Sequence, residues 1–250
     1  MRLEEIVEFL DEFLKIGEWR DKSVNGLQVE GKKEVEKIAF AVDACMEVFR
    51  RAKESEADLI VVHHGLIWNG LSSIRGLMYR RIEFLIRNGI SLYAAHIPLD
   101  AHRSIGNNVQ ILRILDLEPE EEFGEYQGKN IGYIGSFKDK RDLDDVIKSL
   151  KEKLNPDLKV LRFGGNEVKR IGAVSGRGGF AIEEAIEKDL DLFITGEVEH
   201  EIYHIAREGE INVVFGGHYA TETLGIKALM RVVSEEFEIK TEFIDVPTGL

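Results

Sequence analysis

The sequence predicts an α/β protein built from two similar halves. Short, solidly apolar runs, which are typical of buried parallel strands, alternate along the chain with segments whose apolar residues have helical spacing. The segment 57–62 also resembles 190–195, and 91–96 resembles 213–218. We therefore expect a diverged duplication of a βαβ unit. The halves, 1–125 and 126–250, should form one compact unit in which their strand ends converge on one cleft.

In the first half, the helices follow from apolar residues three and four positions apart, such as Leu3 and Ile6 in the helix expected at 3–14. Asp43 and Ser104 each precede a helical pattern and can cap its first turn. The other elements expected here are strands at 35–42, 59–62 and 90–95, helices at 48–53, 77–88 and 105–115, a turn at 23–29 and a loop at 66–76.

The second half follows an acidic stretch, 118–128, which contains one proline and two glycines and is the expected boundary between the halves. Asn155 and Pro156 end a helix expected at 142–154. The remaining elements expected here are strands at 131–137, 158–163, 169–175, 192–195, 212–215 and 239–246, and helices at 180–188, 199–208 and 221–234.

The composition, 44% hydrophobic and 32% charged over 250 residues, is that of an ordinary soluble globular protein. No apolar run approaches the roughly 18 residues of a membrane span, and the N-terminus carries acids where a signal peptide needs a basic start. The single cysteine, Cys45, fits a reducing cytosol. The net charge of −13 disfavours a nucleic-acid partner, although a local basic patch would allow one. We expect a cytoplasmic protein with no membrane partner.

Two adjacent histidines, His63 and His64, follow the apolar run 59–62 and precede Gly65. They should lie at the carboxyl end of a buried strand, where open α/β sheets place their ligands. Neutral imidazole is the commonest side-chain ligand of transition metals. The pair fits a metal site, and it fits equally a satisfied core histidine beside a solvated loop histidine.

The duplication adds further candidate ligands. His96 and His218 end equivalent strands, and an acid follows each of them after four residues, namely Asp100 and Glu222. The predicted metal ligands share positions at or just after strand ends and are His63, His64, Asp100, His218 and Glu222. Mixed nitrogen and oxygen ligands suit zinc, iron, manganese, cobalt or nickel rather than calcium or magnesium. Five side chains suit two ions, with Glu222 as the bridge. The alternative is a set of separate, solvated loop residues.

A second histidine motif, His200-Glu201-Ile202-Tyr203-His204, matches the pattern of zinc peptidases. Such a helix should bury an apolar stripe beside its ligands, whereas the acids in this segment predict an exposed helix. The pattern is short enough to arise by chance, so we favour the exposed helix.

The glycine-rich turn 175–179, between a strand and a helix, allows two interpretations. Its backbone amides can cradle a phosphate with help from Arg177. Alternatively, the glycines serve only a tight turn that needs positive φ angles.

Several motifs resemble the family of GTP cyclohydrolase 1 type 2 homologues, also called Nif-three-like proteins. The resemblance runs from near residue 20 to residue 247. It rests on Asn25-Gly26-Leu27-Gln28, Val62-His63-His64-Gly65, Ala95-His96-Ile97-Pro98-Leu99-Asp100, Thr195-Gly196-Glu197 and Gly217-His218-Tyr219-Ala220-Thr221-Glu222.

The resemblance implies the duplicated Nif-three-like α/β fold, a dinuclear metal site with two divalent ions per subunit, and a toroidal homohexamer. The family's metal ligands fall on the same five residues. Some members carry an inserted domain, for which this chain has no room. The family name implies hydrolytic opening of the guanine ring of GTP with loss of formate. In that reaction a hydroxide generated at the metal would attack C8, and Glu222 or His96 would move the proton.

Two other functions remain open at this point, because a fold family does not fix a substrate. One is a different metal-dependent hydrolase that acts on nucleotides or phosphoesters. The other is a hexameric ring without enzymatic activity, which binds nucleic acid or protein partners and uses its metal in a structural or regulatory role. The cyclohydrolase and the other hydrolase both require a small-molecule substrate, whereas the ring without enzymatic activity requires a macromolecular partner.

Overall fold

The computed structural model describes residues 1–71 and 73–250. By its internal contacts the chain forms two compact units, one of residues 1–99 with 226–246 and one of residues 100–225 with 247–250. The chain passes from one unit to the other after Leu99, after Gly225 and again after Val246, and the halves expected at 1–125 and 126–250 stay a prediction. The duplication itself stays a prediction.

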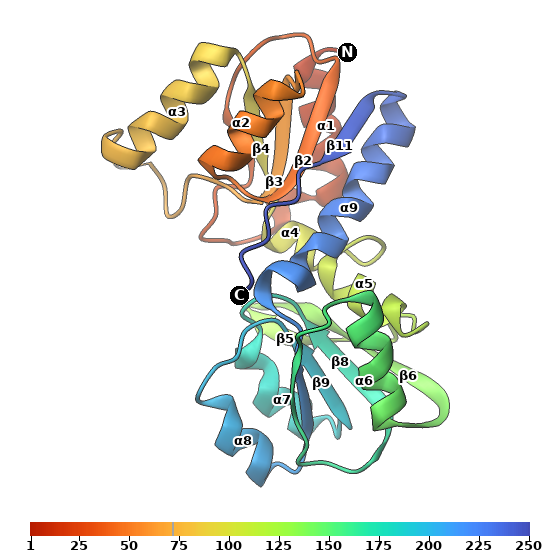
Figure 1. Ribbon diagram of the computed structural model, residues 1–250. Coiled ribbons are helices and arrows are strands. Elements are labelled where there is room, and N and C mark those ends of the chain that lie inside the picture. Colours follow the sequence, from red (N-terminus) through yellow and green to blue (C-terminus); the bar gives the residue numbers. More distant parts are fainter. Residues whose placement is uncertain (72) are drawn as a thin grey trace. The chain divides into compact units, whose positions relative to one another are not determined.

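The first unit contains a five-stranded sheet in the order β1-β4-β3-β2-β11 (Figure 1). The strands β4, β3, β2 and β11 are parallel to one another, and β1 is antiparallel to β4. The strands are β1 (Gly26–Val29), β2 (Lys37–Asp43), β3 (Leu59–His64), β4 (Ser91–Ala94) and β11 (Lys240–Phe243). The helices are α1 (Leu3–Leu14), the 3₁₀ turn η1 (Ile16–Glu18), α2 (Met46–Glu54) and α3 (Gly76–Asn88).

Successive side chains of each strand point to opposite faces of this sheet, and both faces are buried. On one face Ala41 and Ile60 pack in a single cluster with Phe49 of α2 and Leu85 of α3. On the opposite face Tyr93 is fully buried, and its hydroxyl donates a hydrogen bond of 2.7 Å to a carboxylate oxygen of Asp11 in α1. A sheet covered on both faces explains why its strands read as continuous apolar runs.

The second unit contains a six-stranded sheet in the order β5-β6-β8-β9-β10-β7. The strands β8, β9 and β10 are parallel, and β5, β6 and β7 pair antiparallel with their neighbours. They are β5 (Glu121–Tyr126), β6 (Lys129–Asp142), β7 (Lys159–Leu161), β8 (Glu167–Val174), β9 (Leu192–Thr195) and β10 (Asn212–Phe215). The helices are α5 (Asn107–Ile114), α6 (Leu143–Lys153), the 3₁₀ turn η2 (Gly179–Ala181), α7 (Ile182–Glu187) and α8 (Ile202–Glu208).

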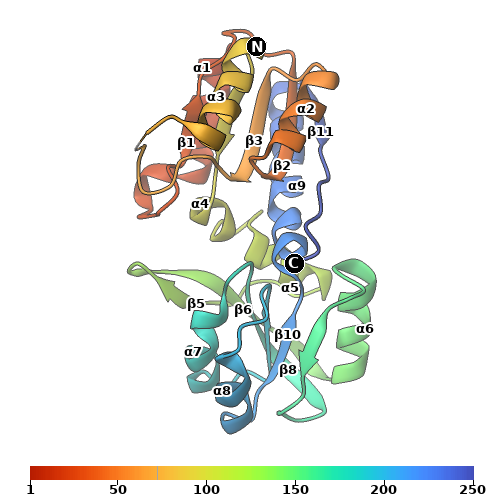
Figure 2. The same ribbon diagram turned by 60° about the vertical axis from the view of Figure 1, so that its left-hand side comes forward.

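Helices lie on both sides of this second sheet. One buried cluster joins Ile194 of β9 with Leu112 of α5 and Leu150 of α6. Figures 1 and 2 show α6 on one side of the sheet and α7 with α8 on the other. Two further helices, α4 (Ile97–Asp100) and α9 (His218–Phe237), contain the residues at which the chain changes unit. The predicted α/β class is confirmed.

The expected helices and strands are present, with ends that shift by a few residues. The acidic stretch at 118–128 was expected to be a boundary, but most of it forms β5 in a hairpin with β6. Phe123 of β5 is buried, and Gln127 and Gly128 both adopt positive φ angles, as a tight hairpin turn requires. The turn expected at 23–29 likewise continues into β1. The loop expected at 66–76 includes Ser72, which lies outside the described residues.

Both predicted helix caps are wrong. Cys45, not Asp43, is the N-cap residue of α2, and Gly106, not Ser104, is that of α5. The Asp43 side chain contacts His64 instead.

Candidate metal centre

Three histidines of the first unit lie together at the carboxyl ends of parallel strands. His63 and His64 are the last residues of β3, and His96 follows the end of β4 by two residues. Each offers one ring nitrogen, and the three nitrogens lie within 4.8 Å of one another. The ring centroids of His63 and His64 are 4.6 Å apart, and that of His96 is 5.1 Å from that of His63. This group can hold a metal ion.

The imidazoles of His63 and His64 are each fixed through Nδ1. Nδ1 of His63 lies 2.9 Å from the carbonyl oxygen of Ala95, and Nδ1 of His64 lies 2.8 Å from Oδ1 of Asp43. A carbonyl or carboxylate oxygen only accepts, so each Nδ1 carries the proton and each Nε2 keeps the lone pair. Metal-binding histidines are generally oriented in this way.

His96 is fixed in the same manner by Asp21. Its Nδ1 lies 3.0 Å from both carboxylate oxygens of Asp21. The carboxylate also accepts hydrogen bonds from the side-chain amide of Asn25 and from the backbone amides of Ser23 and Ile97. Burial by itself would raise the pKa of Asp21. The hydrogen bond and charge of His96, together with the hydrogen bonds from Asn25 and Ser23, have the larger combined effect, so the pKa of Asp21 is lowered. Asp21 is therefore a buried anion, and its role was not predicted from the sequence.

In the second unit, His218 and Glu222 occupy one face of the first turn of α9. Nε2 of His218 lies 3.0 Å from Oε2 of Glu222. Nδ1 of His218 lies 2.6 Å from Oε1 of Glu197, which follows β9. His218 thus has a carboxylate behind its Nδ1, as His64 and His96 have in the first unit.

Asp100 is held by two neutral donors of the second unit. The Ser175 hydroxyl donates to Oδ1 of Asp100 at 2.9 Å, and the side-chain amide of Asn107 donates to the same oxygen at 2.8 Å. One carboxylate oxygen of Asp100 and one of Glu222 lie within 4.8 Å of each other. The second unit therefore brings together Asp100, His218 and Glu222.

Gly176 explains how closely the turn approaches these ligands. A Cβ atom at this position would lie 2.1 Å from Oε1 of Glu222 and 3.3 Å from Nε2 of His218. Gly176 also has a φ angle of 55°, which L-residues with side chains rarely adopt. Only glycine fits both the backbone angle and the space beside Glu222.

The contacts of the glycine-rich turn favour the tight-turn interpretation over a phosphate cradle. Arg177 already pairs with Glu199, with 3.2 Å between Nε and Oε2. Four backbone amides of the turn donate to side chains of the same unit, from Ser175 to Asn108, from Gly176 to Thr221, from Gly178 to Thr195 and from Gly179 to Glu199. These four amides are engaged within the protein, as a tight supporting turn requires.

The structure does not support the peptidase motif. The helix α8 begins at Ile202, so His200 and Glu201 precede it, and His200 and His204 are both exposed. Among the described residues, the groups that can hold a metal include neither histidine.

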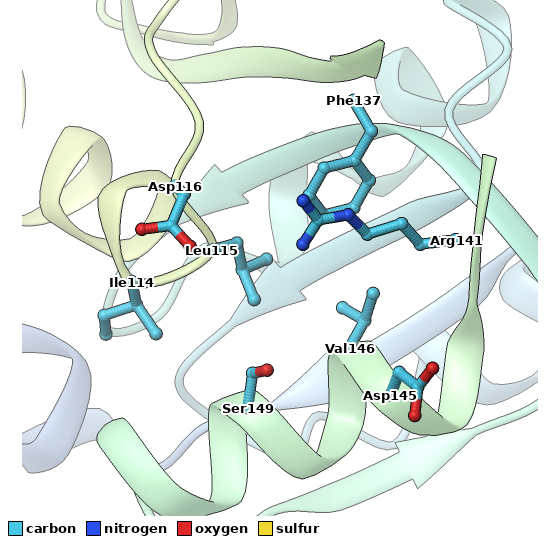
Figure 3. Close-up of a pocket in the computed structure, with 8 residues that line it drawn as sticks. All are labelled: Ile114, Leu115, Asp116, Phe137, Arg141, Asp145, Val146 and Ser149. Atoms are coloured by element: carbon cyan, nitrogen blue, oxygen red, sulfur yellow. The ribbon is translucent and has the colours of Figure 1, made fainter. Parts of the chain in front are cut away.

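A small cavity in the second unit lies apart from these ligands (Figure 3). It measures about 60 Å³ and is lined by residues of α5, β6 and α6 and of the segment after α5. The guanidinium of Arg141 lies over the ring of Phe137, with 4.3 Å between the guanidinium carbon and the ring centroid. A space of this size holds a few water molecules and no nucleotide.

The fold and these side chains define an α/β protein with histidine and carboxylate groups suited to a metal ion. The model of the Duf34/NIF3 (NGG1p interacting factor 3) family matches residues 1–249, and this chain belongs to that family. The "GTP cyclohydrolase 1 type 2 homolog" of Pyrococcus abyssi is 55% identical and that of Archaeoglobus fulgidus 56% identical, each over 100% of both chains.

Solved structures agree with the family assignment. The structure of the protein ybgI has a TM-score of 0.93 and 33% identity, and TTHA1606 from Thermus thermophilus has a TM-score of 0.89 and 40% identity. Both alignments cover 100% of both chains. The predicted family and fold are thereby confirmed. Among the described residues, no helix has the length and apolar character needed to cross a membrane.

Proposed function

We propose that this protein is a metal-dependent hydrolase that uses two divalent ions to open the purine ring of GTP or a related nucleotide. The proposed ligands are the five side chains predicted from the sequence, His63, His64, Asp100, His218 and Glu222. The observation that carries the proposal is the shared orientation of the histidines. In each unit, imidazoles anchored at Nδ1 present Nε2 beside other candidate ligands.

The donor set fits such ions. Imidazole nitrogens and carboxylate oxygens together suit zinc, iron, manganese, cobalt or nickel. Glu222 has two carboxylate oxygens and is the proposed bridge. Bound ions would lower the pKa of water and polarise the reacting carbon of the substrate.

The other roles belong to side chains around the ligands. Asp43 and Glu197 keep His64 and His218 in one tautomer and orientation. Ser175 and Asn107 orient Asp100.

Glu222 and His96 are the proposed proton-transfer residues. For His96 the support is its bond to Asp21, which leaves Nε2 as the nitrogen that can take up or release a proton.

The relatives named "GTP cyclohydrolase 1 type 2 homolog" support the choice of substrate. In the proposed reaction water adds to C8 of the guanine ring, and a ring carbon–nitrogen bond breaks to leave a formamide. A second water hydrolyses that formamide and releases formate.

Formate release from GTP tests this function. Protein loaded separately with zinc, iron, manganese, cobalt or nickel should release formate with at least one metal. E222Q should lose the activity, whereas E235Q, an exposed change on the same helix, should retain it. No formate with any of the metals, from protein shown to be loaded, would contradict the cyclohydrolase proposal. A panel of other nucleotides and phosphoesters would then test for a different hydrolase.

A second candidate function is partner binding without catalysis. The name of the family, NGG1p interacting factor 3, refers to a protein interaction of another member. Substitution of His64 and Glu222 would abolish an enzyme but leave most partner binding intact.

We also propose a cytoplasmic homohexamer. Large apolar side chains are exposed on and before α3, namely Leu71, Ile74, Leu77, Tyr79 and Ile86, and a second copy would cover them. Native mass spectrometry should then give six times the chain mass of 28.4 kDa.

A further inference from the structure

A cavity of about 390 Å³ in the second unit lies at the carboxyl ends of β9 and β10. Its size is within the range of roughly 300–1,000 Å³ that is common for small-molecule sites. The carboxyl ends of parallel strands are also where α/β sheets bind ligands. This cavity was not predicted from the sequence.

The walls combine hydrogen-bonding groups with apolar surface. Asp157 and Glu197 provide carboxylate acceptors, and Lys159 provides an ammonium donor. Phe215 and Leu250 supply apolar surface. The two carboxylates outnumber the one cation, so the walls favour a ligand with N–H donors over a phosphate.

The order of the strands fixes the layout of these groups. The strand β10 lies between β9 and β7, and its last residue, Phe215, pairs with Lys159 of β7. Asp157 precedes β7 by two residues, whereas Glu197 follows the end of β9. Neighbouring strands are about 4.8 Å apart, so the backbones on either side of Phe215 are on the order of 10 Å apart, which leaves room for a purine between Lys159 and Glu197.

We propose that this cavity binds the base of a guanine nucleoside. The adjacent ring N–H and 2-amino groups of guanine match the two oxygens of Asp157, and the carbonyl oxygen of the base matches the ammonium of Lys159. Adenine has no such carbonyl, and hypoxanthine lacks the amino group. This inference rests on the proposed function and assigns the base-binding part of that site.

The same layout links the cavity to the candidate metal centre. Glu197 lines the cavity, and its Oε1 holds Nδ1 of His218 at 2.6 Å. A guanine whose six-membered ring meets Asp157 and Lys159 directs its five-membered ring towards Glu197, on the Nδ1 side of His218. That is the ring that opens in the proposed reaction.

Calorimetric titration of the full-length protein tests the assignment, with guanosine, inosine and adenosine as probes. Guanosine should bind saturably, inosine more weakly and adenosine most weakly. D157N should weaken guanosine binding about tenfold, because charge-assisted hydrogen bonds are lost, and should affect inosine less. K159M should weaken the binding of guanosine and that of inosine to the same extent. The control variants D139N and K138M change exposed residues of β6 outside the cavity, and they should not alter the binding of guanosine or inosine.

Two results would overturn the assignment. One is that guanosine does not bind saturably to the original protein. The other is that guanosine binds D157N and K159M as tightly as it binds the original protein. The assay for formate separates this failure from that of the proposed function. Guanosine binding without formate release supports the cavity and contradicts the cyclohydrolase. Formate release with an unchanged KM for GTP in D157N and K159M contradicts the cavity and leaves the cyclohydrolase intact.

Discussion

Nδ1 of His96 lies 3.0 Å from each carboxylate oxygen of Asp21, a residue 75 positions earlier in the chain. The side chain of Asp21 is only 1% exposed, so this buried anion sets the orientation and tautomer of His96. Asp43 and Glu197 have the same relation to His64 and His218. Carboxylates behind the imidazoles are thus a repeated feature of both units.

The lowered pKa of Asp21 predicts how stability depends on pH. An acid whose pKa is lower in the folded chain stabilises the fold above its ordinary pKa of 3.8, and that contribution disappears as the pH falls through the lower folded pKa. D21N should cost about 1–3 kcal/mol at pH 7, because the hydrogen bonds of a buried network are disrupted. Urea unfolding measures the free energy of unfolding of D21N and of the original protein. The difference between the two proteins should be smaller at pH 3 than at pH 7. A difference that does not change with pH would contradict this account.

Asp11 should behave in the opposite way. Its burial raises the pKa, and the hydrogen bond from Tyr93 only partly offsets this, so ionised Asp11 disfavours the fold. Stability from this residue is therefore greatest below its ordinary pKa of 3.8 and is lost as the pH rises through the folded pKa. D11N keeps an acceptor for Tyr93 without the charge. Urea unfolding should show D11N to be more stable than the original protein at pH 7. The difference in free energy of unfolding between the two should decrease at low pH. A D11N protein that is less stable at pH 7 would count against this reasoning.

Glu197 should matter for metal affinity rather than for folding. E197Q removes the charged acceptor of the Nδ1 proton of His218, and changes behind a ligand typically weaken metal binding roughly 10–100-fold. Competition with a chelator measures this affinity, and thermal melting of the metal-free protein measures stability. E187Q, an exposed change at the end of α7, is the matched control. Equal affinities in E197Q and E187Q would show that Glu197 does not position a ligand.

Gly176 allows steric and backbone effects to be separated. G176A should cost about 1–2 kcal/mol for a side chain at positive φ, and it should also displace Glu222 and weaken metal binding. G128A is the control, because Gly128 has a φ of 89° but a Cβ there would contact nothing within 4 Å. Chemical unfolding should show destabilisation of both variants, and metal titration should show weaker binding only in G176A. Unchanged metal affinity in G176A would contradict the close approach to Glu222.

The sequence predicted the elements that bury apolar side chains, because periodicity records burial. It did not predict β5, whose acidic strand is held by backbone pairing with β6 and by one buried side chain, Phe123. His63, His64 and His96 were predictable because they end apolar strands. Asp21 and Asn107 were missed, since their roles depend on contacts with residues distant in sequence or on another element. Asp43 was assigned as a cap because capping is local and its contact with His64 is not.

Metal content is the most direct test of the central claim that five side chains hold two divalent ions. Elemental analysis of the purified chain, reconstituted with the metals in turn and freed of unbound ions, should give two ions per chain for at least one metal. E222Q and H63A should hold fewer, and E235Q should hold two. The claim would be contradicted by a folded protein that binds no metal, or by E222Q and H63A proteins that retain both ions.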